Sequence, residues 1–249
     1  MTYAEWAPPP WIAAPVACVW STLATGRGGV LPDACVDLIH IEGRGTFVAG
    51  PDTTPGPPAN GPVAGVRLRP GHAAAVLGLP ATELRDRRLA IEDVWCRDGA
   101  ELSRRLDEAP DRHALLAETV ARRASAADPI ALGAVALLAG DPGRRVADLA
   151  TELAVSERHL LRRVRAAVGY GPKTLARVLR FQRLLALAEV GTGSLAELAL
   201  AAGYADQPHM TGEVRRLAGA APTAVLGIAR ARGDVALVRS LQDGRALAA

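Results

Sequence analysis

The chain has 249 residues, of which 49% are apolar, 22% charged and 4% aromatic. Glycine, cysteine and net charge are all modest, which excludes a collagen-like chain, a disulfide scaffold and a strongly disordered chain. The formal net charge of +3 is unevenly divided, since residues 1–143 carry −4 and residues 144–230 carry +6. An acidic front and a basic back predict two domains, the back one facing a polyanion.

Apolar runs, the N-terminal segment and the cysteines also indicate the cellular compartment. No run of about 18 apolar residues is present, so no membrane contact is predicted. The first residues lack a basic segment followed by an apolar run, so no signal peptide is expected. Three widely separated cysteines, Cys18, Cys35 and Cys96, fit a reducing environment. We therefore expect a cytoplasmic protein.

Residues 1–85 contain five short β-like runs separated by turns rich in glycine and proline. Short strands at this spacing predict a small antiparallel β-barrel or sandwich. From Glu83 onward the pattern becomes helical, with apolar positions at helical spacing over 101–107 and about 112–139. Pro110 and Pro129 are expected to start helices. The five predicted strands cover 16–20, 34–41, 46–49, 63–68 and 74–79.

Few residues of the front half point to chemistry. His40 and His72 stand alone, so neither a metal site nor a cofactor is predicted. Asp33 and Asp37 are either polar groups of a pocket or turn and edge residues, and the second interpretation is favoured. Cys18 and Cys35 fit buried structural positions, and a sensing role for any of the three cysteines stays open. The tryptophans are expected in the core, at Trp6, Trp11, Trp20 and Trp95.

The strongest signal is an internal repeat in the back half. With a shift of 50 residues, Ser156 aligns with Asp206 and His159 with His209; Gly169 likewise aligns with Gly219. Each copy has the pattern of a short helix, a tight turn and a second helix that ends at glycine. The repeat therefore predicts two helix-turn-helix motifs.

The residues of each copy support this prediction. Ser156 and Asp206 are good N-caps, and Gly203 provides the turn of the second copy. Apolar residues spaced four apart bury each second helix, while Arg158, Arg162 and Arg165 fall outside that seam. Such a helix suits insertion into the major groove of DNA.

The two copies are joined by an amphipathic stretch. Residues 173–189 predict one helix of 17 residues, which is about 25 Å long. A spacer of this length could hold two recognition helices near the ~34 Å separation of successive major-groove segments.

Residues 144–230 resemble the DNA-binding domain of the AraC family of transcription regulators. The segments 202–211 and 220–225 carry the resemblance most closely. It implies that Arg158 and Arg162 face bases in the first recognition helix. In the second helix it implies the same for Gln207, Pro208, His209 and Thr211.

The front half also resembles a known type of domain. The segments 31–40, 48–53, 67–72 and 84–86 are similar to a domain of uncharacterised function that precedes AraC-type domains in actinobacterial regulators. That domain is taken for a cupin-like sensor without an agreed ligand.

The second copy departs from the AraC pattern. Met210 and Val214 stand where aromatic residues are usual, and Gly212 stands where a basic residue is usual. Gly212 costs about 1 kcal/mol of helix stability relative to alanine. It also lacks the side chain with which a basic residue would contact a base or a phosphate. We therefore expect less sequence readout from the second helix.

The other polar and basic candidates are assigned to phosphate contacts or solvated faces, namely Ser156, Lys173, Arg177, Arg180, Arg215 and Arg216.

The resulting prediction is an α+β chain and a sequence-specific transcription regulator rather than an enzyme. It has a sensor domain (1–85), a helical extension (86–140), a double helix-turn-helix domain (141–230) and a C-terminal tail (231–249). Expected partners are double-stranded DNA, a small-molecule effector and RNA polymerase, with a homodimer as the assembly. The alternative is a DNA-linked enzyme of the alkylation-repair or cupin type, which would need cysteine or metal-ligand settings that the sequence lacks.

Overall fold

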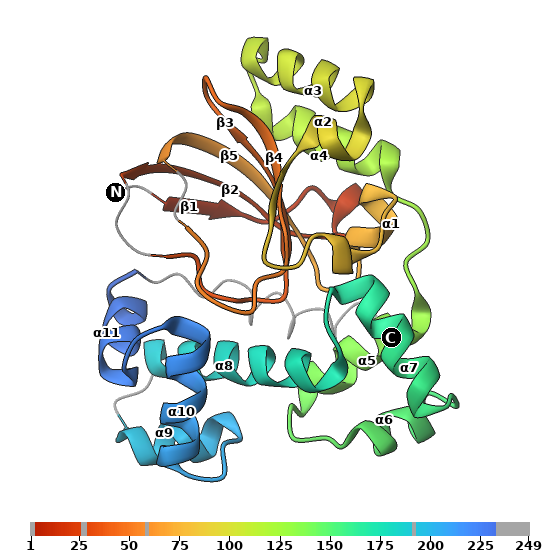
Figure 1. Ribbon diagram of the computed structural model, residues 1–249. Coiled ribbons are helices and arrows are strands. Elements are labelled where there is room, and N and C mark those ends of the chain that lie inside the picture. The colour runs from red at the N-terminus through yellow and green to blue at the C-terminus, as the bar shows by residue number, and fades with distance from the viewer. Residues whose placement is uncertain (1–2, 26–28, 58–59, 191–192, 233–249) are drawn as a thin grey trace.

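The computed structural model describes residues 3–25, 29–57, 60–190 and 193–232 (Figure 1). A curved antiparallel sheet forms the front part, with strand order β1-β2-β5-β3-β4-β6. This agrees with the predicted antiparallel front domain followed by an all-helical part. The strands are β1 (Tyr3–Trp6), β2 (Val16–Thr25), β3 (Val36–Ile41), β4 (Gly45–Ala49), β5 (Asn60–Leu68) and β6 (Arg88–Ala90).

Helices cover one face of the sheet and then build the back part. Helix α1 (Ala73–Leu77) lies between β5 and β6, and α2 (Ile91–Trp95), α3 (Arg97–Glu108) and α4 (Arg112–Arg123) follow β6. The back part contains α5 (Pro129–Gly140), α6 (Val146–Glu152), α7 (Glu157–Val168), α8 (Pro172–Val190), α9 (Leu195–Ala202), α10 (Gln207–Ala218) and α11 (Pro222–Arg232). Two 3₁₀ turns, Pro10–Ile12 and Ala81–Glu83, lie in the front part.

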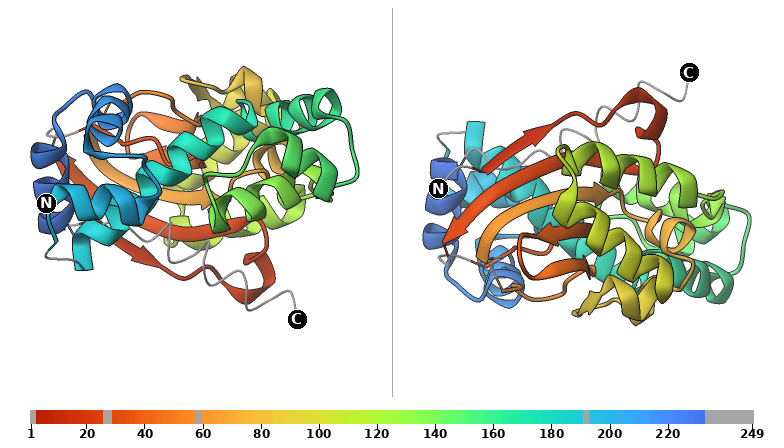
Figure 2. Two further views of the ribbon diagram at one scale, coloured as in Figure 1. Left: turned by 90° about the horizontal axis from the view of Figure 1, so that it is seen from below. Right: turned by 90° about the horizontal axis from the view of Figure 1, so that it is seen from above.

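Side chains alternate between the two faces of the sheet. Leu38, Val66 and Leu68 point to one face, where they pack with apolar residues of α1, α3 and α4. Figure 1 and the right-hand view of Figure 2 show α3 and α4 lying over this face. The front domain therefore has its apolar core between the sheet and these helices.

The opposite face of the sheet carries a cluster of charged residues around Arg67. The guanidinium of Arg67 lies 3.1 Å from Glu5, 3.2 Å from Asp37 and 3.5 Å from Asp33. The indole Nε1 of Trp20 donates to Asp37 at 2.7 Å. Burial raises the pKa of Asp33 to about 6, although Arg67 acts in the opposite direction. We call Arg67 and these three carboxylates the Arg67 cluster.

Three local predictions for the front half were wrong. Residues 74–79 were expected as a strand, but residues 73–77 form α1, whose Val76 and Leu77 pack under the sheet. β6 lies in the stretch expected to be helical and pairs with β4. Helix α4 begins at Arg112 with Asp111 as its N-cap, two residues beyond the expected start at Pro110. Pro129, in contrast, is the first residue of α5 as expected.

Some of the tryptophans and cysteines are buried and others are exposed. Trp20 and Trp95 are buried, whereas Trp6 and Trp11 are 50% and 59% exposed, so the core prediction was wrong for the last two. Cys18 and Cys35 are buried and Cys96 is exposed. Burial raises the pKa of Cys18 to about 12, which keeps this thiol protonated at neutral pH.

The back part has one apolar core, built around Phe181 and Leu184 of α8. Helix α5 belongs to this core through Ala131, Ala134 and Leu138, among others, while α3 and α4 pack on the sheet. The expected extension at 86–140 is therefore shared between the two cores. Across the described ranges, no helix combines the length and apolar character that spanning a membrane requires.

Candidate nucleic-acid interface

The first helix-turn-helix is formed by α6 and α7. The Ser156 hydroxyl accepts a hydrogen bond from the backbone N–H of His159 at 3.2 Å and so caps α7. Leu160 and Val164 are fully buried, and α7 ends at Gly169 in the left-handed conformation. The N-cap and the buried seam lie where the sequence predicted them.

The second helix-turn-helix is formed by α9 and α10. Ser194 and Glu197 form a capping box at the start of α9. The Asp206 carboxylate caps α10 by accepting from the His209 N–H at 2.7 Å. Gly203 lies between the helices with φ +92°, as expected for the turn. The second helices of the two copies, α7 and α10, therefore share their capping chemistry.

The turn of the first copy lacks the glycine of the second, and it is one residue shorter from that position to the N-cap of the next helix. Ala154 occupies the place of Gly203 and has φ +53°. This backbone region costs a residue with a Cβ about 1 kcal/mol or more. We expect Ala154→Gly to raise the free energy of unfolding by about 0.5–1 kcal/mol, as measured by urea denaturation.

Ala166→Gly is the matched control, because Ala166 is exposed within α7. There the same change is expected to cost about 1 kcal/mol. Equal effects of the two variants would contradict the assignment of strain to Ala154.

Helix α8 separates the two motifs. Its 19 residues give a length of about 28 Å. Figure 1 and the left-hand view of Figure 2 show α7 and α10 toward opposite ends of α8 and on the same side of it. The two motifs therefore lie at the two ends of one helix.

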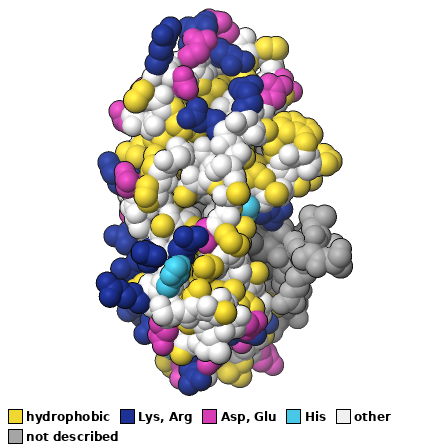
Figure 3. All heavy atoms as spheres, turned by 90° about the vertical axis from the view of Figure 1, so that its right-hand side faces the viewer, with side chains coloured by type: hydrophobic (Ala, Val, Ile, Leu, Met, Phe, Trp, Pro, Cys, Tyr) yellow, Lys and Arg dark blue, Asp and Glu magenta, His cyan; other side chains and the backbone are white. Residues whose placement is uncertain are grey.

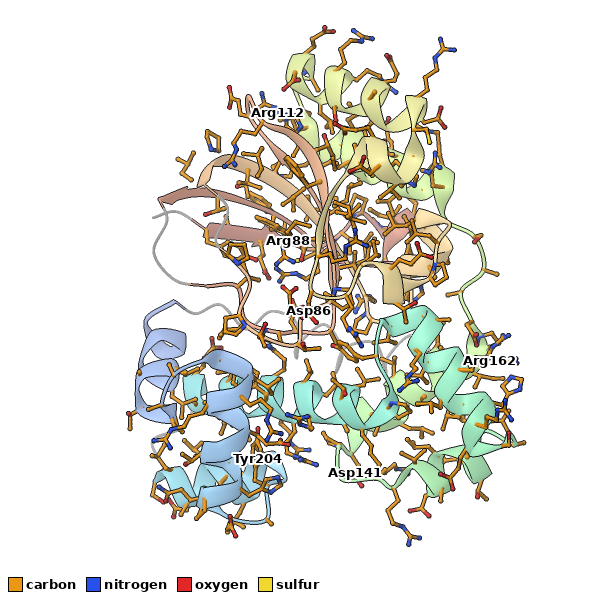
Figure 4. All side chains as sticks on the ribbon, in the orientation of Figure 1. Asp86, Arg88, Arg112, Asp141, Arg162 and Tyr204 are labelled. Atoms are coloured by element: carbon orange, nitrogen blue, oxygen red, sulfur yellow. The ribbon has the colours of Figure 1, made fainter. Side chains whose placement is uncertain are left out.

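Helix α7 presents a basic stripe away from the core. Arg158, Arg162 and Arg165 are exposed and spaced four and three residues apart, which places them on one helical face. None of the three forms an ion pair within the described ranges. Figure 4 shows Arg162 pointing outward from α7, and Figure 3 shows basic side chains gathered on one edge of the lower half. The sequence predicted Arg158 and Arg162 as base contacts, and Arg165 lies on the same exposed face of α7.

Helix α10 presents a less charged face. Gln207 and Pro208 are exposed and Thr211 is half-buried, while Gly212 adds no side chain to this face. The His209 ring is engaged within the protein: its Nδ1 accepts from the Ala205 N–H at 3.3 Å. Its edge also packs on Tyr204, with ring centroids 5.4 Å apart.

Two of the phosphate candidates form internal contacts instead of lying free. Arg177 Nε donates to Glu213 at 2.9 Å, and Arg180 approaches the other oxygen of Glu213 at 3.4 Å. Arg180 also donates to the Pro142 carbonyl and lies 5.4 Å from the centroid of the Tyr204 ring. These contacts tie α10 to α8. Sequence reasoning did not single out Glu213, and only the spatial pairing gives it a role.

The remaining phosphate candidates lie on the surface. Lys173, Arg215 and Arg216 are exposed and form no ion pair with any residue in the described part of the chain. The Ser156 hydroxyl is engaged as the cap of α7. The described residues hold no group of three or more His, Cys, Asp or Glu side chains arranged to bind a metal.

Comparison with known families agrees with this geometry. The family model described as a helix-turn-helix domain matches residues 149–227. The C-terminal part is an AraC-type helix-turn-helix domain. Residues 4–90 match a domain of unknown function (DUF6597). Since helix-turn-helix domains bind duplex DNA, the C-terminal part is a DNA-binding domain.

Solved structures of low similarity are also found. ToxT from Vibrio cholerae shares 12% identity, with 92% of this chain and 99% of that chain covered and a TM-score of 0.45. The C-terminal domain of AraT, a response regulator from Geobacillus stearothermophilus, shares 19% identity; 41% of this chain and 86% of that chain are covered, with a TM-score of 0.39. The search of curated proteins found no match to the chain.

Proposed function

We propose that this regulator reads two successive major-groove segments with α7 and α10, and that Arg158 and Arg162 donate hydrogen bonds to base edges. The observation that carries the proposal is the exposed arginine stripe of α7, whose guanidinium groups have no acidic partner in the described ranges. Arginine paired with guanine is the commonest base-specific contact in the major groove.

We assign the smaller share of readout to α10. Gln207, Pro208 and Thr211 lie toward its outer face, but His209 is held by Ala205 and Tyr204. Gly212 offers no side chain to a base. Lys173, Arg215 and Arg216, together with Arg165, suit phosphate contacts, which position the protein without reading sequence. For Arg177 and Arg180 we propose the structural role that their contacts with Glu213 support.

We further propose a cytoplasmic, non-enzymatic regulator whose front domain responds to a small-molecule effector. The high pKa that burial gives Cys18, and the burial of Cys35, argue against a nucleophilic cysteine at either position. Homodimer formation and contact with RNA polymerase complete the proposal, because two linked copies would raise affinity through effective concentration.

The test is a binding selection from a random duplex pool with the intact protein, followed by affinity measurements with variants. Arg158→Ala and Arg162→Ala are each expected to lose base preference at one or two positions, by about 1–3 kcal/mol. Arg216→Ala is expected to weaken binding to all sequences alike and to reduce the salt dependence by about one charge.

Arg163→Ala provides the matched control on the same helix. Arg163 pairs with Asp128 of the α5 N-cap, so the variant removes one positive charge away from the arginine stripe. It should retain the base preference of the wild type. A uniform loss of affinity in Arg162→Ala, with base preference intact, would reassign Arg162 to a phosphate.

A further inference from the structure

Two loops of the front domain contact the DNA-binding part. Residues 30–34 and 51–56 are joined to each other, since the backbone groups of Val30 and Gly56 exchange hydrogen bonds of 3.0 and 2.9 Å. Figure 1 shows this orange part of the chain between the sheet and α8. We call the two segments the paired loops.

One of the paired loops reaches the C-terminal ends of both recognition helices. A β-carbon added at Gly169, which ends α7, would lie 2.6 Å from Cγ of Pro51. A β-carbon at Gly219, which ends α10, would lie 3.7 Å from Cγ of Pro55. Five residues of one loop, 51–55, therefore connect the two helix ends.

The other loop holds α8 between these two points. The side chain of Gln182 is buried and donates from Nε2 to the Pro32 carbonyl at 2.6 Å. Leu31 and Ala34 pack into the apolar core of the back part. Tyr170, directly after Gly169, is also buried, and neighbouring Asp33 and Asp52 add to the effect of burial in raising the pKa of its hydroxyl.

The paired loops are fixed to the sheet by charge. The Asp52 carboxylate accepts two hydrogen bonds from Arg88 of β6, at 2.9 and 2.6 Å. Asp86 accepts from the Thr53 N–H at 2.6 Å, and Asp33 joins the other loop to Arg67 of β5. Figure 4 shows Arg88 and Asp86 between the sheet and α8. Pro51 and Pro55 add fixed φ angles. The loops therefore form a rigid surface that belongs to the sheet.

We propose that the paired loops are positioning elements for DNA reading, which set the separation and relative orientation of α7 and α10. This inference rests on the proposed reading of two groove segments. Helix α8 joins the motifs within the back part, whereas the paired loops reach the C-terminal ends of both recognition helices, and α8, from outside. The front domain thereby determines which spacing between two DNA elements the protein accepts.

The experiment measures spacing preference. A random-pool selection with the wild type first provides the two-element sequence, and duplexes are then made with the elements moved by one or two base pairs. Each base pair rotates the second element by about 35°. We expect the wild type to lose about 10-fold or more in affinity per base pair, and Pro51→Ala/Pro55→Ala to lose only about 2–3-fold, because misaligned contacts cost less when the helices can adjust.

The control is Pro10→Ala/Pro110→Ala, which removes two exposed prolines far from the paired loops in the sequence and should keep the wild-type profile. Thermal unfolding confirms that each variant is folded. An unchanged spacing profile in Pro51→Ala/Pro55→Ala would overturn the inference. Absence of any enriched sequence with the wild type would instead contradict the proposed function.

A distance measurement tests the inference without DNA. Spin labels at exposed positions Ala166 and Arg216, in a Cys96→Ser background, report the separation of α7 and α10. The wild type should give one narrow distance distribution and Pro51→Ala/Pro55→Ala a broader one. Equal widths would overturn the role of the paired loops even if the protein binds DNA as proposed.

Discussion

Arg67→Met is expected to lower the free energy of unfolding by about 3–5 kcal/mol, because it leaves carboxylates buried without their cation. The Arg67 side chain is 13% exposed and lies within 3.5 Å of Glu5, Asp33 and Asp37. Burial already raises the pKa of Asp33 to about 6, which shows how poorly this site solvates a negative charge. Urea denaturation at pH 7.5 measures the change.

Arg104→Met serves as the control for this prediction. Arg104 also contacts two carboxylates, Glu101 and Glu108, but on the solvent face of α3. Water screens such pairs, so the midpoint of unfolding should barely move. If Arg67→Met behaved like Arg104→Met, the Arg67 cluster would not be the electrostatic anchor that its burial indicates.

Glu213→Gln is expected to destabilise the protein by about 2–3 kcal/mol, because two guanidinium groups lose their shared carboxylate at the α8–α10 contact. Glu213 is 8% exposed, and Arg177 and Arg180 approach it at 2.9 and 3.4 Å. The glutamine side chain keeps the shape of the site, so the change isolates charge. Urea denaturation gives the stability, and titration with the selected duplex gives the affinity.

We also expect Glu213→Gln to weaken binding to the selected duplex by about 10-fold. Without the ion pairs to α8, helix α10 must be ordered when the protein binds DNA, and this ordering costs free energy. Asp148→Asn is the control, because its pair with Arg145 is exposed and lies within α6 and its N-cap. This variant should preserve both properties. Full DNA affinity in a destabilised Glu213→Gln protein would show that the ion pairs act on folding alone.

The helix-turn-helix copies were predictable because their signals are local. An N-cap such as Ser156 or Asp206 acts within three residues, and Gly203 sets the turn through its own φ angle. The period of buried Leu160 and Val164 is also set within one helix. Such signals survive without knowledge of the rest of the fold, and the predicted positions of these caps and seams were confirmed.

The front half was less predictable because its short apolar runs fit either type of element. The stretch 74–79 reads equally as a strand or a short helix, and packing under the sheet selects α1. β6 spans three residues, and its pairing with β4 lies about 40 residues away in sequence. Trp6 and Trp11 are apolar residues that the fold leaves on its surface.

The candidate site shows the same division. The sequence placed Arg158 and Arg162 outside the seam of α7, and the structure leaves both exposed. It assigned Arg177 and Arg180 to phosphate contacts or solvated faces, because the sequence does not show whether a carboxylate faces an arginine on a helix. Glu213 lies more than 30 residues beyond both arginines, so only the packing of α10 on α8 shows the pairing.

The insertion of Leu31 and Ala34 into the core around Phe181 has a consequence for protein engineering. A chimera that grafts this DNA reader onto a foreign sensor would leave an apolar gap where those two side chains now sit. A direct fusion of the DNA-binding part to another domain is therefore expected to expose apolar surface and aggregate, unless residues 30–34 are included in the fusion.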